Sequence, residues 1–155
     1  MQKIVMVCLG NICRSPVAEG ILRHKANQHG LKITIDSAGT SSNHEGENPD
    51  RRSQANAKKN GVDISTLVSR PFTIKDFDAF DKIYVMDASN YRDVKALARN
   101  ANDIAKVEMI LNLVYPGSNK AVPDPYFGGE EGFQQVFELL DTACDRIVEQ
   151  LSTKY

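Results

Sequence analysis

The sequence has few cysteines and no cluster of metal-binding residues. Its 155 residues include three cysteines, an odd number, and a chain of this length can bury enough apolar surface to fold without disulfides. Reduced thiols are therefore expected, as in a cytoplasmic protein. The three histidines lie apart from any pair of cysteines, so the sequence lacks the spacing of a zinc site. We expect neither a metal nor another cofactor.

Excess charge and long apolar runs are also missing. The formal net charge is −1, so no basic surplus indicates nucleic acid or an anionic membrane as a partner. No apolar run reaches membrane-spanning length, and Cys8 would interrupt the apolar segment of a signal peptide. We therefore expect no nucleic-acid binding and no membrane insertion. Without repeats or linkers, residues 1–155 are predicted to form a single domain.

Short apolar runs alternate with helical patterns along the chain. The apolar runs predict four strands, although periodicity alone does not exclude a helix over the last of them: 2–7, 31–35, 82–86 and 107–111. Helical spacing and end signals predict the following helices: 16–29 before Gly30, 51–60 after a cap at Asp50, 74–77 after a capping pair of Thr73 and Asp76, a helix from a cap at Ser89 to about Arg99, and 133–151.

This alternation predicts an α/β fold. We expect a doubly wound, four-stranded parallel sheet with helices on both faces, in the flavodoxin-like strand order 2-1-3-4. Ligands of such folds bind beyond the carboxyl ends of the strands. The loops that should meet at this edge are the one beginning at Cys8, 36–42, 87–90 and 116–129.

Residues 7–16, Val-Cys-Leu-Gly-Asn-Ile-Cys-Arg-Ser-Pro, carry the strongest chemical signal. A loop between a strand and a helix N-terminus directs backbone N–H groups at an anion. These amides, the helix dipole and the Arg14 guanidinium all stabilise negative charge, so we expect Cys8 to act as a thiolate nucleophile. The same loop would bind a phosphoryl group, with Arg14 holding two of its oxygens. A buried cysteine beside a surface arginine is the structural alternative.

Asp124 is the candidate proton donor. A carboxylic acid near the leaving oxygen accelerates phosphoryl transfer by about 10²–10⁴-fold. Pro123 and Pro125 restrict the backbone on both sides, so the carboxylate would be held in one place. The other interpretation of Pro-Asp-Pro is a turn without a catalytic role.

The pattern Cys-x5-Arg-Ser-Pro, together with Asp124-Pro125-Tyr126, resembles the low-molecular-weight protein tyrosine phosphatase family. The likeness includes segments 36–40 and 86–90 and spans nearly the whole chain. It implies an enzyme that hydrolyses a phosphotyrosine-containing protein or a small aryl phosphate through a phosphocysteine on Cys8 and releases inorganic phosphate. By the same resemblance, Asp124 protonates the leaving oxygen and then activates water, while Arg14 binds the phosphoryl group.

The resemblance also assigns the rest of the phosphate-binding loop, which consists of Leu9, Gly10, Asn11, Ile12, Cys13 and Ser15. Asn11 and Ser15 would hold the loop and hydrogen-bond the thiolate, whereas an ordinary N-cap is the other interpretation of Ser15. Cys13 would be the redox partner of Cys8 in a reversible disulfide, or else a small buried thiol without a redox role. Ile12 favours tyrosyl substrates, because the arginine-phosphatase branch typically has threonine there.

The substrate slot shows a departure from the family pattern. Its predicted walls are Asn43, His44, Tyr126 and Phe127. Family members usually carry Trp or Tyr where Asn43 stands. Either the loss of one stacking partner weakens aryl binding by about 0.5–1.5 kcal/mol, or the slot accepts other phosphoesters. His44 either replaces that wall or is an exposed loop residue without a role. Leu67 lies near where many relatives have a histidine that supports Asn11, so a less rigidly held loop is expected.

Three other functions remain as alternatives. An arsenate reductase needs two further cysteines, but only Cys144 lies downstream, on the apolar stripe of the last helix. An anion-binding module without turnover would not need Cys8, Arg14 and Asp124 together. A nucleotide-binding P-loop is disfavoured because no Gly-Lys-Ser/Thr follows the glycine.

Overall fold

The computed structural model describes residues 2–126 and 128–153. Its centre is a parallel sheet with strand order β2-β1-β3-β4. The strands are β1 (Gln2–Cys8), β2 (Ile33–Gly39), β3 (Lys82–Val85) and β4 (Val107–Met109). The predicted α/β class and the order 2-1-3-4 are therefore confirmed. Because β1 is paired on both sides and covered on both faces, residues 4–7 are a continuous buried run.

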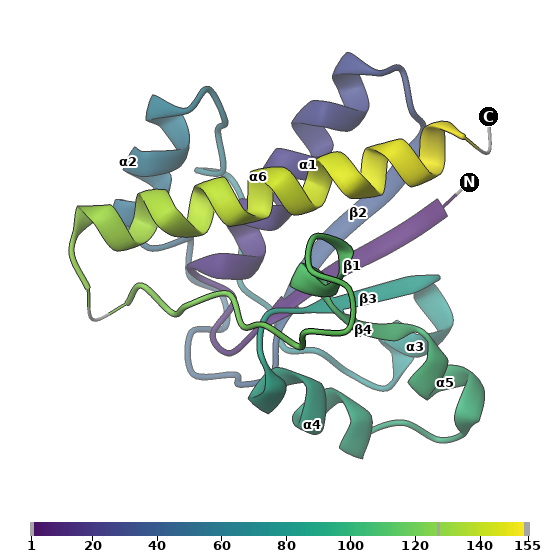
Figure 1. Ribbon diagram of the computed structural model, residues 1–155. Coiled ribbons are helices and arrows are strands. Elements are labelled where there is room, and N and C mark those ends of the chain that lie inside the picture. The colour runs from purple at the N-terminus through teal and green to yellow at the C-terminus, as the bar shows by residue number, and fades with distance from the viewer. Residues whose placement is uncertain (1, 127, 154–155) are drawn as a thin grey trace.

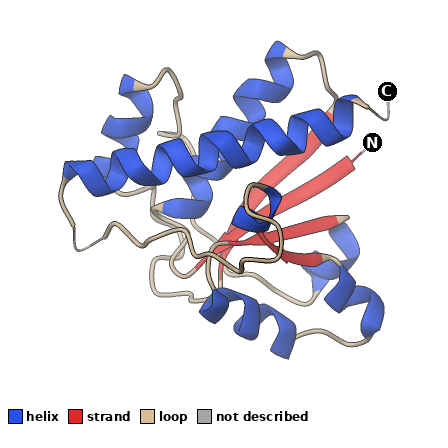
Figure 2. Cartoon of the chain, viewed as in Figure 1, coloured by secondary structure: helices blue, strands red, loops and turns tan. Residues whose placement is uncertain are grey.

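Helices cover both faces of this sheet (Figures 1 and 2). One face carries α1 (Arg14–Gln28), α2 (Arg51–Lys59) and α6 (Glu130–Ser152). The other face carries α3 (Lys75–Ala79), α4 (Ala88–Ala96) and α5 (Ala101–Ala105). A 3₁₀ helix, η1 (Ile110–Leu113), follows β4 directly. None of the helices in the described part of the chain is long and apolar enough to cross a membrane.

Each helical layer encloses its own apolar core. Ile4 and Met6 of β1 belong to the core beneath α1 and α6, whereas Val5 and Val7 belong to the opposite core. Successive side chains of a strand point to opposite faces, so β1 contributes to both cores. The predicted stripe of α6 is fully confirmed, since all eight of its residues are buried: Phe133, Val136, Phe137, Leu140, Cys144, Ile147, Val148 and Leu151. Burial raises the pKa of the Cys144 thiol.

All four strands differ from their predicted limits, β1 and β3 by one residue and β2 and β4 by more. Residues 36–39 were predicted to be loop because they are small and polar, but they continue β2 and pair with residues 5–8 of β1. Backbone pairing with β1 overrides their low strand propensity. The fourth strand ends at Met109, and the remainder of the predicted strand 107–111 enters η1.

The helix limits also needed correction. Helix α4 is capped by Asp87, whose carboxylate accepts a hydrogen bond from the Asn90 N–H (2.8 Å), not by Ser89, and it ends at Ala96 rather than near Arg99. Helix α5 was not predicted. It is one short turn capped by the Asn100 side chain, and its tertiary contacts are not visible in a local pattern.

Three other helix starts lie at or near their predicted positions. Asp50 caps α2 as predicted, with its carboxylate accepting the Arg52 N–H at 2.8 Å. The Thr73 N–H donates to Asp76 at 2.8 Å, which is one of the two bonds of a capping box. However, the cap position of α3 belongs to Ile74, which makes no side-chain cap bond, and the helix is displaced to 75–79 from the predicted 74–77. Helix α1 begins at Arg14, two residues before Pro16.

Phe77 tests the packing of the core beneath α3. It is 0% exposed, and its ring meets that of Phe72 edge to face with centroids 5.4 Å apart. Phe77→Ala should lower the free energy of unfolding by about 3–5 kcal/mol, because it removes contacts and leaves a cavity. Chemical denaturation measures this change. Tyr115→Ala, at a side chain that is 42% exposed, is the control and should cost about 1 kcal/mol or less. Equal losses in the two variants would contradict the packing described.

Candidate active site

A pocket of about 190 Å³ opens beyond the carboxyl ends of the strands. In Figure 1 the strands run from right to left, so these ends and their loops lie at the left of the sheet. Most of the predicted site residues line this pocket together with Ser41: Cys8, Leu9, Gly10, Ile12, Cys13, Arg14, Asn43, His44, Asp124 and Tyr126. Asn11 and Ser15 contribute through hydrogen bonds described below, and Phe127 lies outside the described residues.

Cys8 stands at the end of β1 and is 2% exposed. Its Sγ lies 3.0 Å from the Ser15 Oγ. The cap position of α1 belongs to Cys13, and Ser15 is the second residue of the helix, so the interpretation of Ser15 as an ordinary N-cap is wrong. A hydroxyl beside the sulfur can donate a hydrogen bond to a thiolate, and the nearby N-terminus of α1 adds its positive dipole end.

Asn11 fixes the shape of the loop between β1 and α1. It is buried and has φ of +56°, in the left-handed region that asparagine tolerates better than most residues. Its Nδ2 donates to Ser15 Oγ (2.8 Å) and to Ser37 Oγ (2.9 Å), and its Oδ1 accepts from the Arg70 N–H (3.1 Å). These bonds use both donors and the acceptor of the amide without a histidine, while Leu67 packs against the core beneath α1 and α6.

Two members of this network were not predicted. Ser37 Oγ donates to Glu19 Oε1 at 2.6 Å, and the other oxygen of Glu19 accepts from Arg23 at 2.8 Å. Glu19 is only 3% exposed. A charged residue on the buried side of a predicted helix is unusual, and this could have identified Glu19 from the sequence. The network joins the loop to α1 and β2.

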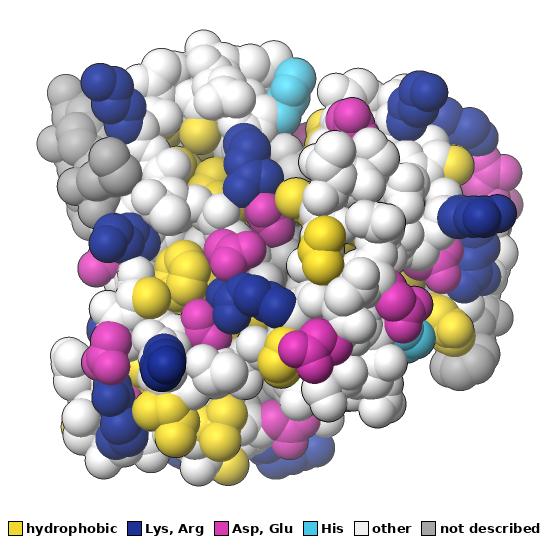
Figure 3. All heavy atoms as spheres, turned by 180° about the vertical axis from the view of Figure 1, so that it is seen from behind, with side chains coloured by type: hydrophobic (Ala, Val, Ile, Leu, Met, Phe, Trp, Pro, Cys, Tyr) yellow, Lys and Arg dark blue, Asp and Glu magenta, His cyan; other side chains and the backbone are white. Residues whose placement is uncertain are grey.

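Ion pairs of Arg70 also support the loop. In Figure 3, Lys and Arg side chains stand beside Asp and Glu side chains on much of the face opposite that of Figure 1. Arg70, whose N–H binds Asn11, pairs with Asp36 and Asp76 at 3.0 Å each. Burial opposes ionisation of Arg70, but both carboxylates favour it, and its pKa is raised.

Asn11→Ala should destabilise the protein and lower its turnover. Alanine is strained at φ of +56° and leaves Ser15, Ser37 and the Arg70 N–H without this partner. We expect a loss of about 2–4 kcal/mol in the free energy of unfolding. Asn119 is a matched control because it also has positive φ (+51°) but is exposed, and Asn119→Ala should cost about 1 kcal/mol. Comparable losses in thermal or chemical unfolding would refute the special role of Asn11.

Arg14 is buried, with 3% of its surface exposed, so the alternative of a surface arginine is wrong. Its Nη1 donates to Asp87 Oδ2 (2.7 Å) and to the Val122 carbonyl (3.0 Å). The other oxygen of Asp87 caps α4, and this residue therefore locks the guanidinium to a fixed element. Asp87 was not predicted as a site residue, although its place at the end of a strand was recognisable.

Asp124 lies across the pocket from the loop. Its Oδ2 is 3.8 Å from Arg14 Nη2, and its Oδ1 accepts from the Tyr126 N–H at 3.0 Å. The side chain is 43% exposed, so water can reach it. The Val122 N–H bonds the Met86 carbonyl (2.8 Å) and ties this loop to the end of β3. One carboxylate oxygen of Asp124 thus bonds within its own loop, while the other faces Arg14 in the pocket.

The walls of the pocket come from two loops. The rings of His44 and Tyr126 have centroids 6.3 Å apart at an interplanar angle of 46°. His44 Nδ1 lies 2.9 Å from Glu47 Oε2, and the ring packs so close to Gly10 that a Cβ there would be 3.0 Å from it. Asn43 also lines the pocket, but His44 is the ring that approaches Tyr126.

Cys13 is a buried neighbour of the nucleophile candidate. Burial raises the pKa of its thiol to about 12, against the opposing effect of the neighbouring Ser53 side chain. All three cysteines are free thiols. Across residues 2–126 and 128–153, no three His, Cys, Asp or Glu side chains are grouped to hold a metal ion.

Known proteins resemble this chain over nearly all of its length. The family model described as low molecular weight phosphotyrosine protein phosphatase matches residues 3–155. A Schizosaccharomyces pombe protein of that name is 41% identical over 90% of each chain. A protein tyrosine phosphatase structure from Entamoeba histolytica superposes with a TM-score of 0.92, at 36% identity over 99% of each chain. A Drosophila arginine phosphatase structure has a TM-score of 0.89 and 30% identity, over 97% of this chain and 98% of that one.

Proposed function

Because the chain belongs to the low molecular weight phosphotyrosine protein phosphatase family, we propose that it hydrolyses phosphotyrosine or a related aryl phosphate through a phosphocysteine on Cys8. Membership of the family makes the protein an enzyme of the protein-tyrosine-phosphatase type, and we propose the mechanism by which it acts. The observation that carries it is the pocket that Cys8, Arg14 and Asp124 line together.

In the first proposed step, the Cys8 thiolate attacks phosphorus and the bond from phosphorus to the tyrosyl oxygen breaks. The loop amides and Arg14 stabilise the charge on the transferred phosphoryl oxygens. Asp87 supports this role because it holds one end of the Arg14 guanidinium at 2.7 Å. Asp124 gives its proton to the departing phenolate, which leaves as a neutral phenol.

In the second proposed step, Asp124 acts as a carboxylate. It takes a proton from water, and the oxygen of that water attacks phosphorus while the sulfur–phosphorus bond breaks. Inorganic phosphate leaves and Cys8 returns as a thiolate beside the Ser15 hydroxyl, which lies 3.0 Å from its sulfur. Neither step uses a metal or a cofactor, and we propose a cytoplasmic location, where this thiol would stay reduced.

An aromatic phosphoester is the substrate class that the pocket supports best. Tyr126 and His44 offer ring surfaces at its mouth, and Ile12 lines it with an apolar side chain. A tyrosyl ring gains stacking contacts there that a serine side chain lacks. Phosphoarginine is the competing substrate, because a structure 30% identical to this chain is that of an arginine phosphatase.

A substrate panel tests the proposal. Peptides that carry phosphotyrosine, phosphoarginine or phosphoserine would be compared by kcat/KM with a chelator present. We expect the phosphotyrosine peptide to be the best substrate by about tenfold or more, which corresponds to one ring-stacking contact. A preference for phosphoarginine would overturn the substrate class, and loss of turnover on chelation would overturn the metal-free mechanism.

We further propose that Cys13 protects Cys8 from irreversible oxidation. Peroxide converts the Cys8 thiolate to a sulfenic acid, and the Cys13 sulfur then attacks it to form a disulfide with release of water. The attacking form is the thiolate, and the pKa of Cys13 is raised to about 12 by burial, so this form is scarce at neutral pH.

Disulfide formation after peroxide treatment should therefore speed up with rising pH. The fraction of Cys13 thiolate increases about tenfold per pH unit below its pKa. Quenched-flow mass spectrometry would follow the disulfide, and recovery of activity with dithiothreitol would report reversibility. In Cys13→Ser, the same treatment should give inactivation that dithiothreitol does not reverse. Full recovery of that variant would contradict the protective role.

A further inference from the structure

Arg52 of α2 contacts the loop that carries Asp124. Its Nη2 donates to the Tyr126 carbonyl at 2.7 Å, and its Nη1 reaches the Gly128 carbonyl at 3.4 Å. On the other side, Nε and Nη2 bind the two oxygens of Asp50 at 3.1 and 3.0 Å. One guanidinium therefore bonds to two separate segments, and a planar group with five N–H donors is suited to this task.

Two aromatic rings lie close to the same guanidinium. The Arg52 Cζ lies 4.8 Å from the centre of the Phe133 ring and 5.5 Å from that of Tyr126. Phe133 in turn packs on Ile12 and Cys13 of the phosphate-binding loop in a small apolar cluster. Contacts of this kind between a cation and a ring contribute about 0.5–1 kcal/mol each at exposed sites.

One end of this arrangement is one hydrogen bond from Asp124, and the other is one hydrogen bond from the phosphate-binding loop. The Tyr126 N–H donates to Asp124 Oδ1 at 3.0 Å. Tyr126 therefore binds Arg52 through its carbonyl and the Asp124 carboxylate through its N–H. The Asp50 N–H donates to the Ile12 carbonyl at 2.8 Å, within the phosphate-binding loop. Asp50 and Arg52 thus connect the two halves of the site.

We propose that Arg52 is a positioning residue that sets the distance between Asp124 and the leaving-group oxygen. The inference rests on the proposed function, because it assumes that Asp124 is the proton donor. The Asp124 side chain is 43% exposed and Tyr126 is 38% exposed, so these two side chains have little packing of their own. A displacement of about 1 Å in such a group can cost on the order of 10²-fold in rate.

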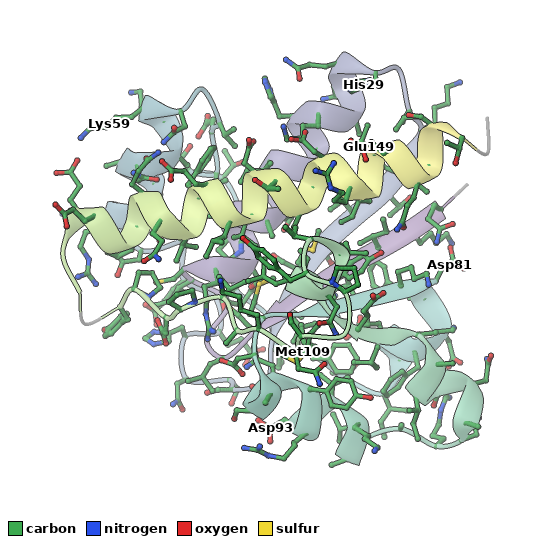
Figure 4. All side chains as sticks on the ribbon, in the orientation of Figure 1. His29, Lys59, Asp81, Asp93, Met109 and Glu149 are labelled. Atoms are coloured by element: carbon green, nitrogen blue, oxygen red, sulfur yellow. The ribbon has the colours of Figure 1, made fainter. Side chains whose placement is uncertain are left out.

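Other contacts also join α2 to α6. Lys59 pairs with Glu130, and Gln134 Oε1 accepts from Asn56 (2.8 Å) and Asn60 (2.9 Å). Figure 4 labels Lys59 on α2, near the N-terminal end of α6. Lys59→Ala is consequently a matched control, since it removes a cation from the same interface but leaves the loop around Asp124 untouched.

The test compares kcat/KM for two substrates, because this constant reports the step in which the phenolate leaves. Phenyl phosphate has a poor leaving group and needs the acid, whereas para-nitrophenyl phosphate needs it less. Arg52→Ala should lower kcat/KM for phenyl phosphate by about 10–100-fold and for para-nitrophenyl phosphate by about threefold or less. Lys59→Ala should stay within about twofold of wild type for both substrates. Arg52→Lys keeps the positive charge but loses the paired N–H donors of the guanidinium, and its loss should again be larger for phenyl phosphate, but smaller than that of Arg52→Ala.

A double mutant separates positioning from structural damage. In an Asp124→Ala background, Arg52→Ala should cause no further loss, because the group that it positions is gone. Equal losses with both substrates, or an undiminished loss in the Asp124→Ala background, would overturn the inference while leaving the proposed function intact. If Asp124→Ala alone has no effect on phenyl phosphate, the acid step of the proposed function fails instead.

Discussion

Cys8→Ser should lower kcat for an aryl phosphate by at least about 10⁴-fold, because removal of an enzyme nucleophile has an effect of that order or larger. A serine hydroxyl stays protonated at this position, and the hydrogen-bond partner of the side chain, Ser15, is not a general base. The neighbours of the side chain, including Ser15 Oγ at 3.0 Å from the sulfur, remain in place. Steady-state turnover of para-nitrophenyl phosphate with a chelator present measures the loss.

The same variant should still bind phosphate. The loop amides and Arg14 do not depend on the sulfur, so inorganic phosphate should raise the melting temperature of Cys8→Ser. Cys144→Ala is the control for loss of a thiol, since Cys144 is buried in the core of α6 away from the pocket, and its kcat should stay within about threefold of wild type. Undiminished turnover by Cys8→Ser would rule out the thiolate mechanism.

Asp124→Ala should lower kcat/KM for phenyl phosphate by about 10²–10⁴-fold, which is the contribution of a positioned general acid. The carboxylate lies 3.8 Å from Arg14, close to where the ester oxygen of a bound phosphoryl group would be. The loss should be smaller for para-nitrophenyl phosphate, because its phenolate is stable without a proton. A series of substituted phenyl phosphates would therefore show a steeper dependence of log kcat/KM on leaving-group pKa in the variant.

Asp141→Ala is the control for this acid. Asp141 of α6 pairs with Lys25 of α1 at 3.0 Å and does not line the pocket. Its removal should change kcat/KM by about twofold or less for every substrate. Equal leaving-group dependence in wild type and Asp124→Ala would show that the proton comes from another source.

Local signals predicted much of the framework. The apolar run before Cys8, the cap at Asp50 and the stripe of α6 each depend on neighbouring residues and were confirmed. The prediction of a loop over residues 36–39 was wrong, because these residues form a strand beside β1. Helix α5, which is a single turn, was missed. In the first case tertiary contacts outweighed local propensity.

The same distinction applies to the site. The residues that line the pocket came from motifs contiguous in sequence, whereas their supports are distant: Asp87 is 73 residues from Arg14, and Tyr126 is 74 residues from Arg52. No spacing pattern marks such pairs. His44 is intermediate, because its place opposite Tyr126 depends on the absence of a side chain at Gly10.

Trapping the covalent intermediate tests the central claim most directly. Asp124→Ala would be mixed with an aryl phosphate, quenched within milliseconds and digested with trypsin, which cuts after Lys3 and Arg14 and leaves both Cys8 and Cys13 in one peptide. Fragmentation of that peptide by mass spectrometry locates the phosphoryl group. We predict one phosphoryl group on the sulfur of Cys8, formed before phosphate is released. Its presence on Cys13, or turnover without any phosphorylated peptide, would contradict the mechanism.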